Sequence, residues 1–503
     1  MSEPPNSYRQ ILRSTSIIGG SSVMNILIGL VRVKVLAVLL GPAGVGLAGL
    51  YNSIMSTAGT LVGFGLGSSG VRQIAEAGGE PQTLSRVRQA LWYANLLLGA
   101  LGLLLLWLLR EPVSRWVFDD TTHAGAVGWL GLGVLLSLIA GSQTALLQGL
   151  RRIGDMARLS VLGSLLGTLA GISLIALFGQ EGILAYTLAG PVISVGVAGY
   201  FVAKVPRPAQ ALLSLTELMR QWRLMLGLGV VFMVTGLMAG LTQLAVRSLI
   251  ARDLGLVATG YFQAAWTISM MYIGFVLSAM GADYYPRLTQ AIDDRAHANR
   301  LVNEQARVAL LLAGPVLLGM MAFAPLVINL LYARNFGPTV EILRWQILGD
   351  LIKVATWPMA FILLARGAGR LYFLAESAWL GFYLAGVWLG LPRFGLVVTG
   401  FMFLLAYGMY FTLIYLVVTR VNGFRWYPGN LGLLFGLALA GILLQVLSRV
   451  SVGWTYSVGA VLVVGLSGYS LYQLSLLTQV GGRLGQIAAR VRWVVERKGV
   501  VHG

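Results

Sequence analysis

Apolar stretches of about 20 residues follow one another along almost the whole chain, and this feature restricts the fold more than any other. A helix needs about 20 apolar residues to cross a bilayer. Only 11% of the 503 residues are charged, against about 25% in soluble domains, so the chain could not cover a soluble surface. We expect an all-α polytopic membrane protein with about 14 transmembrane helices. The estimated spans are 15–40, 46–71, 89–109, 125–148, 156–178, 183–203, 224–246, 258–283, 305–332, 341–364, 371–391, 394–418, 430–448 and 453–475.

The positions of lysine and arginine predict how the chain is oriented. Most of the 36 Lys and Arg residues fall in segments that lie on one side if the N-terminus is inside. Cytoplasmic loops of membrane proteins carry this excess. We therefore expect a multi-pass protein of the bacterial inner membrane with both termini in the cytoplasm. The same distribution accounts for the net charge of +18 without nucleic acid as a partner.

A weak internal repeat predicts two halves of six helices each. Gly41 and Gly46 match Gly255 and Gly260 at an offset of 214, and the run at Gly149 resembles the run at Gly367 at an offset of 218. Six intervening helices give both copies the same orientation, so the halves would be related by a pseudo-two-fold axis along the membrane normal. Coincidence between glycine-rich helices is the alternative. The expected division is an N-lobe (1–204, helices 1–6), a cytoplasmic linker (205–223), a C-lobe (224–420, helices 7–12), two extra helices (421–480) and a basic cytoplasmic tail (481–503).

Cations occur inside the first predicted helix of each half. The first span holds Arg32 and Lys34, and the repeat places Lys34 next to Arg247. A charge at the bilayer centre costs about 2.5–3.5 kcal/mol on insertion scales, so such residues usually have a function. We interpret Lys34, Arg247, Lys353 and Arg32 as substrate-binding cations of a cavity between the lobes. Arg32 could instead extend to the interface.

Carboxylates accompany Lys353 in the second half. Asp350 lies three residues before Lys353, which puts the two on one helical face, while Asp283 and Glu376 lie near the ends of their spans. We interpret Asp350, Glu376 and Asp283 as ion-coupling residues. The alternatives are a purely structural pair for Asp350 with Lys353 and a solvated position for Asp283.

Several classes of chemistry have no support in the sequence. There is no Cys, the three His residues are far apart, and no nucleotide-binding loop of the form G-x-x-x-x-G-K-[ST] occurs. We therefore expect no catalytic residues, no metal site and no cofactor.

Two runs of residues resemble one transporter family. The run Trp-Gln-x-x-Gly-Asp-x-x-Lys ending at Lys353, followed by Phe-Leu-Ala-Glu ending at Glu376, resembles the tenth and eleventh helices of Wzx-type flippases. The Gly-Pro-Ala-Gly run from Gly41, with Lys34 before it, resembles their first hairpin. These are O-antigen and lipid III (enterobacterial common antigen) flippases of the polysaccharide biosynthesis family, in the multidrug/oligosaccharidyl-lipid/polysaccharide exporter superfamily. The family usually has twelve helices, so the last pair is a departure.

The resemblance implies a transporter rather than an enzyme. Its substrate would be an undecaprenyl-pyrophosphate-linked glycan, moved from the cytoplasmic to the periplasmic leaflet by alternating access and coupled to H⁺ or Na⁺. Membrane lipids and a glycan polymerase or chain-length regulator are the further expected partners. A small-molecule or drug antiporter of the same fold, and a membrane glycan polymerase or acyltransferase, are the alternatives.

Overall fold

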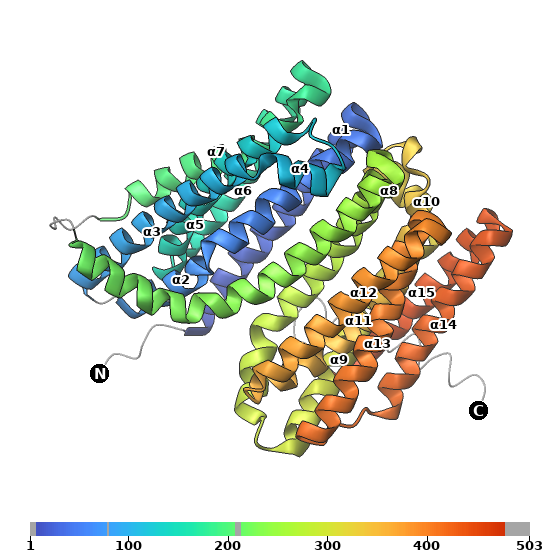
Figure 1. Ribbon diagram of the computed structural model, residues 1–503. Helices are drawn as coiled ribbons and strands as arrows, with labels where there is room; N and C mark the ends of the chain where they lie inside the picture. The colour runs from blue at the N-terminus through green and yellow to red at the C-terminus, as the bar shows by residue number, and fades with distance from the viewer. Residues whose placement is uncertain (1–6, 78–79, 207–212, 478–503) are drawn as a thin grey trace, which may run out of the picture. The chain divides into compact units, whose positions relative to one another are not determined.

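The computed structural model describes residues 7–77, 80–206 and 213–477, and in these ranges every regular element is a helix (Figure 1). The side chains of residues 7–18, 228, 231–232, 275–276 and 278–283 are outside the description. The predicted basic tail, 481–503, and part of the predicted linker also lie outside the described residues. The helices are α1 (Ser7–Gly63), α2 (Leu66–Ala77), α3 (Pro81–Leu108), α4 (Arg110–Phe118), α5 (Ala124–Gly149), α6 (Ile153–Phe178), η1 (Gly179–Gly182), α7 (Ile183–Ala203), α8 (Leu215–Ala291), α9 (Arg295–Ala322), α10 (Ala324–Leu331), η2 (Arg334–Phe336), α11 (Thr339–Ala365), α12 (Gly369–Phe394), η3 (Gly395–Val397), α13 (Val398–Asn422), α14 (Pro428–Val450) and α15 (Val452–Leu477).

The described chain contains ten helical stretches that are long and apolar enough to cross a membrane. Four of them contain an interruption at a glycine: Gly19–Gly63, Ile153–Ala203, Met233–Gly274 and Gly369–Asn422. The expectation of an all-α polytopic membrane protein is confirmed. If each of these four stretches crosses the membrane twice, once on each side of its glycine, the ten stretches are consistent with fourteen crossings.

The two longest helices, α1 and α8, bend at equivalent glycines. Gly41 has φ of 64° in α1 and Gly255 has φ of 83° in α8, 214 positions further on. Glycine tolerates this left-handed region because it has no Cβ. The same pair of residues marks the predicted repeat, so the sequence match reflects a shared backbone conformation.

Two later interruptions repeat as well. The turns at η1 and η3 begin at Gly179 and Gly395, which both have positive φ and lie 216 positions apart. The turn after α5 has positive φ at Arg151 and the turn after α11 has it at Gly367, again 216 positions apart. The predicted match of Gly149 with Gly367 was therefore two residues out of register, because Gly and Arg are abundant enough in both runs to align in more than one way.

The packing forms two compact units, which we describe separately. The first comprises the described residues of Met1–Gln263 together with Leu331–Asn335. In it α3 packs on α5, α5 on α7, α7 on α6 and α6 on α1 (Figure 1). One apolar core gathers around Leu50, Ile54 and Leu130, and a second around Ile74, Leu91 and Leu147.

The second unit comprises Ala264–Leu330 and the described residues of Phe336–Gly503. Here α11 packs on α13 and α9, and α12 packs on α13. The last two helices, α14 and α15, both pack against α9 (Figure 1). Asn303 of α9 bonds to the start of α14 through Asn430, at 2.8 Å, and Arg307 donates to Gln473 of α15 at 2.8 Å. The extra helix pair is therefore an integral part of this unit.

Our first prediction concerns the glycine contact next to the kinks. A Cβ at Gly260 would overlap the backbone carbonyl of Pro42, and a Cβ at Gly46 would overlap the carbonyl of Leu256. The substitution Gly260→Ala should therefore force α8 away from α1 and lower the free energy of unfolding by about 1–3 kcal/mol. Thermal unfolding of the detergent-purified protein measures this loss.

The matched control is Gly227→Ala on the same helix. No atom lies within 4 Å of a Cβ built at Gly227, so this change should be neutral or slightly stabilising. Equal unfolding temperatures for the two variants would contradict the predicted contact.

Candidate functional site

The first unit contains a buried guanidinium. Arg247 of α8 is 7% exposed. Its Nε donates to Gln263 Oε1 at 2.8 Å, and one terminal nitrogen donates to Ser53 Oγ at 2.8 Å. The ring of Phe262 lies 5.9 Å from the guanidinium carbon. A charge removed from water needs such polar contacts, since burial without them is very costly.

The other predicted cations of this unit lie on α1. Lys34 donates a hydrogen bond to the backbone carbonyl of Tyr332, and Arg32 is half-buried. Lys34 and Arg247 each lie about two helical turns before the kink of their own helix. Relative to these glycines the two cations differ in position by one residue.

The second unit buries Asp350 in the middle of α11. This carboxylate is fully buried and accepts a 2.5 Å hydrogen bond from Ser269 of α8. Its second oxygen, Oδ1, is buried without a hydrogen-bond partner in the described part of the chain. An unsatisfied oxygen in a dry site costs free energy, and protonation or a bound cation would relieve that cost.

Lys353 lies one turn after Asp350 and faces an aromatic neighbour. Its ammonium is 3.5 Å from Met270 Sδ and 5.5 Å from the ring centre of Tyr407. Asp350 and Glu376 both interact electrostatically with it. Lys353 therefore lies within electrostatic range of two carboxylates, one of them on its own helix.

Glu376 of α12 is held by donors on both of its oxygens. Trp379 Nε1 donates to Oε2 at 2.7 Å, and Tyr410 Oη donates to Oε1 at 2.6 Å. Tyr372 also forms a side-chain hydrogen bond to it. These donors hold a half-buried carboxylate in one orientation at the edge of an aromatic cluster that includes Tyr407.

Sequence analysis missed most of these partners. Trp379 could have been found, because it lies three residues after Glu376 on the same face. The partners Ser53, Ser269 and Tyr410 could not be predicted from local sequence. Each lies on a different helix or helix segment from the charged residue that it contacts.

Asp283 and Arg344 are further charged residues of the second unit. The side chain of predicted Asp283 lies outside the described residues. Arg344, which the sequence left without a role, is 7% exposed and donates to the Met321 carbonyl at 3.2 Å. Within the described residues, no three His, Asp or Glu side chains cluster as metal ligands.

Long apolar helices with buried cations and carboxylates are typical of membrane transporters. The structure is similar to "Lipid II flippase MurJ, inward closed conformation", with a TM-score of 0.68 and 11% identity over 92% of this chain and 99% of that one. It is also similar to an inward-facing multidrug resistance MATE family transporter of the MOP superfamily, with a TM-score of 0.67 and 18% identity over 79% and 95% of the two chains. At such identities the likeness shows the fold alone.

The sequence comparisons are more specific. The family model for "Polysaccharide biosynthesis protein" matches residues 35–341, more than half of the chain, so the chain belongs to this family. Proteins named lipid III flippase from Escherichia coli (strain K12) and Shigella flexneri are each 26% identical over 400 residues, covering 78% of this chain and 94% of theirs. The family expected from the sequence is thereby confirmed. These relatives are named for lipid III and not for O-antigen, so the O-antigen part of the expectation stays a prediction.

Our second prediction tests how Asp350 and Lys353 depend on each other. Lys353→Met should lower the free energy of unfolding by about 3 kcal/mol, because a buried carboxylate loses its counter-charge. Adding Asp350→Asn should restore part of that loss, giving a coupling of about 0.5–3 kcal/mol in a double-mutant cycle. Thermal unfolding of the four proteins gives the cycle. Strictly additive losses would contradict the pairing.

Proposed function

We propose that this protein is a flippase that moves an undecaprenyl-pyrophosphate-linked oligosaccharide from the cytoplasmic to the periplasmic leaflet. Membership of the polysaccharide biosynthesis family supports the proposal, as does the similarity to named lipid III flippases along nearly their whole length. The protein would act as a transporter and not as an enzyme.

The observation that carries the mechanism is the buried guanidinium of Arg247. Two of its hydrogen bonds go to neutral side chains, Gln263 and Ser53. Arginine binds phosphate oxygens through paired, charge-assisted hydrogen bonds. A pyrophosphate could replace these neutral acceptors with stronger ones, and Lys34 would add a second cation. Arg32 and Lys353 remain proposed substrate-binding cations.

The two parts of the proposed substrate need different paths through the protein. A polyprenyl tail is stable only in hydrocarbon, while the glycan must pass through a polar cavity. We therefore propose alternating access between two six-helix halves, 1–204 and 224–420, with both termini in the cytoplasm of a cell with an inner membrane. The matched kinks at Gly41 and Gly255 support a repeat of this kind.

Ion coupling is assigned to the second half. The proposed sites for H⁺ or Na⁺ are Asp350 and Glu376. Asp350 has one oxygen without a hydrogen-bond partner among the described residues, and both carboxylates interact electrostatically with Lys353. Binding of one H⁺ or Na⁺ would make the cluster more positive by one unit and strengthen its attraction for an anionic headgroup. Release of the ion would weaken that attraction.

The decisive experiment is reconstitution. Proteoliposomes with the purified protein should move an undecaprenyl-pyrophosphate-linked glycan between leaflets faster than empty liposomes. A cationic dye tested in the same vesicles should not be transported. Transport of the dye without transport of the glycan would indicate a drug exporter and contradict the flippase proposal.

Our third prediction concerns Arg247. The variant Arg247→Gln should lower glycan translocation at least tenfold, because the buried contact to the pyrophosphate is lost. The matched control is Arg252→Gln on the same helix, where the side chain is exposed and pairs with Asp119 at 3.3 Å. Wild-type translocation by Arg247→Gln, with equal insertion of both variants, would remove Arg247 from the site.

Our fourth prediction concerns the coupling ion. Asp350→Asn and Glu376→Gln should abolish the acceleration of transport by an H⁺ or Na⁺ gradient, while slow exchange without a gradient continues. The control is Asp293→Asn, whose side chain is 96% exposed. Translocation measured with and without each gradient tests this. A full gradient response in both site variants would exclude these carboxylates from coupling.

A further inference from the structure

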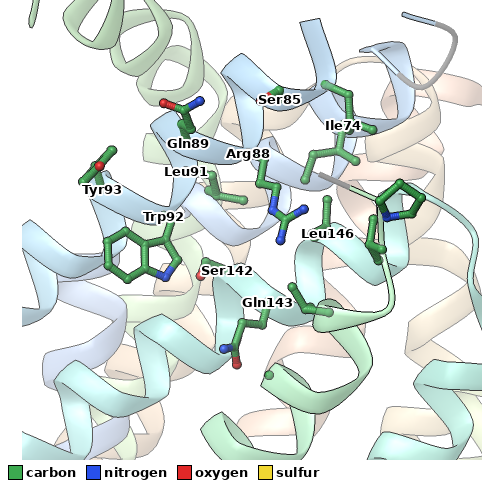
Figure 2. Close-up of a pocket in the computed structure, with 15 residues that line it drawn as sticks. Ile74, Ser85, Arg88, Gln89, Leu91, Trp92, Tyr93, Ser142, Gln143 and Leu146 are labelled. Atoms are coloured by element: carbon green, nitrogen blue, oxygen red, sulfur yellow. The ribbon is translucent and has the colours of Figure 1, made fainter. Parts of the chain in front are cut away.

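A cavity of about 440 Å³ lies inside the first unit, away from Lys34 and Arg247. Its walls come from corresponding ends of several helices: the first turns of α3, the last turns of α5 and α7, and α2 (Figure 2). In the proposed orientation this end of the unit is cytoplasmic. Small-molecule sites typically measure about 300–1,000 Å³, so the cavity is large enough for more than an inorganic anion.

The residues that line the cavity include one cation, Arg88, and several hydrogen-bonding side chains. The guanidinium of Arg88 extends into it, toward Gln143 and Leu146 (Figure 2). Gln143 and Ser85 also line it. Gln143 Oε1 is buried without a hydrogen-bond partner in the described part of the chain. A buried amide oxygen in this state needs a donor, and the hydroxyl of a bound molecule would supply one.

The remaining wall is apolar, with aromatic residues beside it. Leu84, Leu91 and Val202 supply apolar surface. Trp92, which is 42% exposed, lies one turn after Arg88 on α3, and Tyr93 lies further from Arg88 (Figure 2). Tryptophan and tyrosine are enriched at the level of lipid headgroups. A ligand with a phosphate, hydroxyl groups and the start of an acyl chain would match all three features.

We propose that this cavity binds the headgroup of an anionic phospholipid, a resident lipid distinct from the transported substrate. Arg88 pairs with the phosphodiester, Gln143 accepts a hydrogen bond from the glycerol headgroup, and the leucines contact the first acyl carbons. Basic pockets between membrane helices on the cytoplasmic side commonly bind such lipids. The proposal does not depend on the flippase activity, because it concerns binding and not transport.

The test measures binding to the delipidated, full-length protein in detergent by native mass spectrometry. The probes are phosphatidylglycerol and phosphatidylcholine with the same acyl chains, and the competitors are inorganic phosphate and undecaprenyl pyrophosphate. Phosphatidylglycerol should bind at least tenfold more tightly than phosphatidylcholine. Arg88→Gln should lower its affinity at least tenfold, while Arg86→Gln should stay within twofold of wild type. Arg86 is the matched control, since it is exposed, lies two residues away on α3 and does not line the cavity.

A second variant keeps the test informative if Arg88→Gln misfolds. Gly199 lines the cavity. A Cβ built on Gly199 would lie 3.4 Å from the side-chain amide nitrogen of Gln143. Gly199→Leu should therefore fill the cavity and exclude the lipid while Arg88 keeps its charge. Binding by this variant equal to wild type would overturn the proposal.

Three other results would also overturn it. Equal binding of the two phospholipids would mean that charge is not recognised. Displacement of phosphatidylglycerol by millimolar inorganic phosphate would mean a site for free anions. Displacement by undecaprenyl pyrophosphate would assign the cavity to the transported substrate. Glycan translocation is measured separately, so a failure of the flippase proposal would leave this binding result intact.

Discussion

A charged or hydrogen-bonding group inside a bilayer has no water to bond with, so it needs partners in the protein or in a bound molecule. This constraint explains why the described chain is helical, since a helix satisfies its own backbone. It also explains why the buried charges described above contact polar or aromatic groups. Arg247 bonds to Gln263 and Ser53, and Glu376 accepts bonds from Trp379 and Tyr410. Retaining such groups in hydrocarbon is costly, and their presence indicates a function beyond stability.

Glycine determines where the continuous helices change direction. The kinks at Gly41 and Gly255, with the turns at Gly179 and Gly395, divide long apolar stretches at corresponding places of the repeat. Glycine also allows two helices to pack closely. Gly260 of α8 has no Cβ and so leaves room for the backbone of α1 at Pro42. Two copies of one pattern thus produce two similar helix arrangements within a single chain.

The sequence predicted much of the fold but only part of the site. Apolar length and glycine position are local properties, so the apolar spans and the match of Gly41 with Gly255 could be read directly. The identities of Lys34 and Arg247 as intramembrane cations followed in the same way. Their partners could not be predicted, because Ser53 is 194 positions from Arg247 and Tyr332 is 298 positions from Lys34. Such contacts depend on which helices pack together, and single-sequence periodicity does not contain that information.

The two units differ in the kind of charge they bury. In the first unit the described intramembrane charges named above are arginine and lysine. In the second unit Asp350 and Glu376 flank Lys353, and a carboxylate can lose its charge by taking up a proton. A fixed positive charge suits the binding of an anion, while a variable charge suits its release. The contrast supports the proposal that the cations of the first unit, Lys34 and Arg247, hold the headgroup while the carboxylates of the second unit respond to the ion.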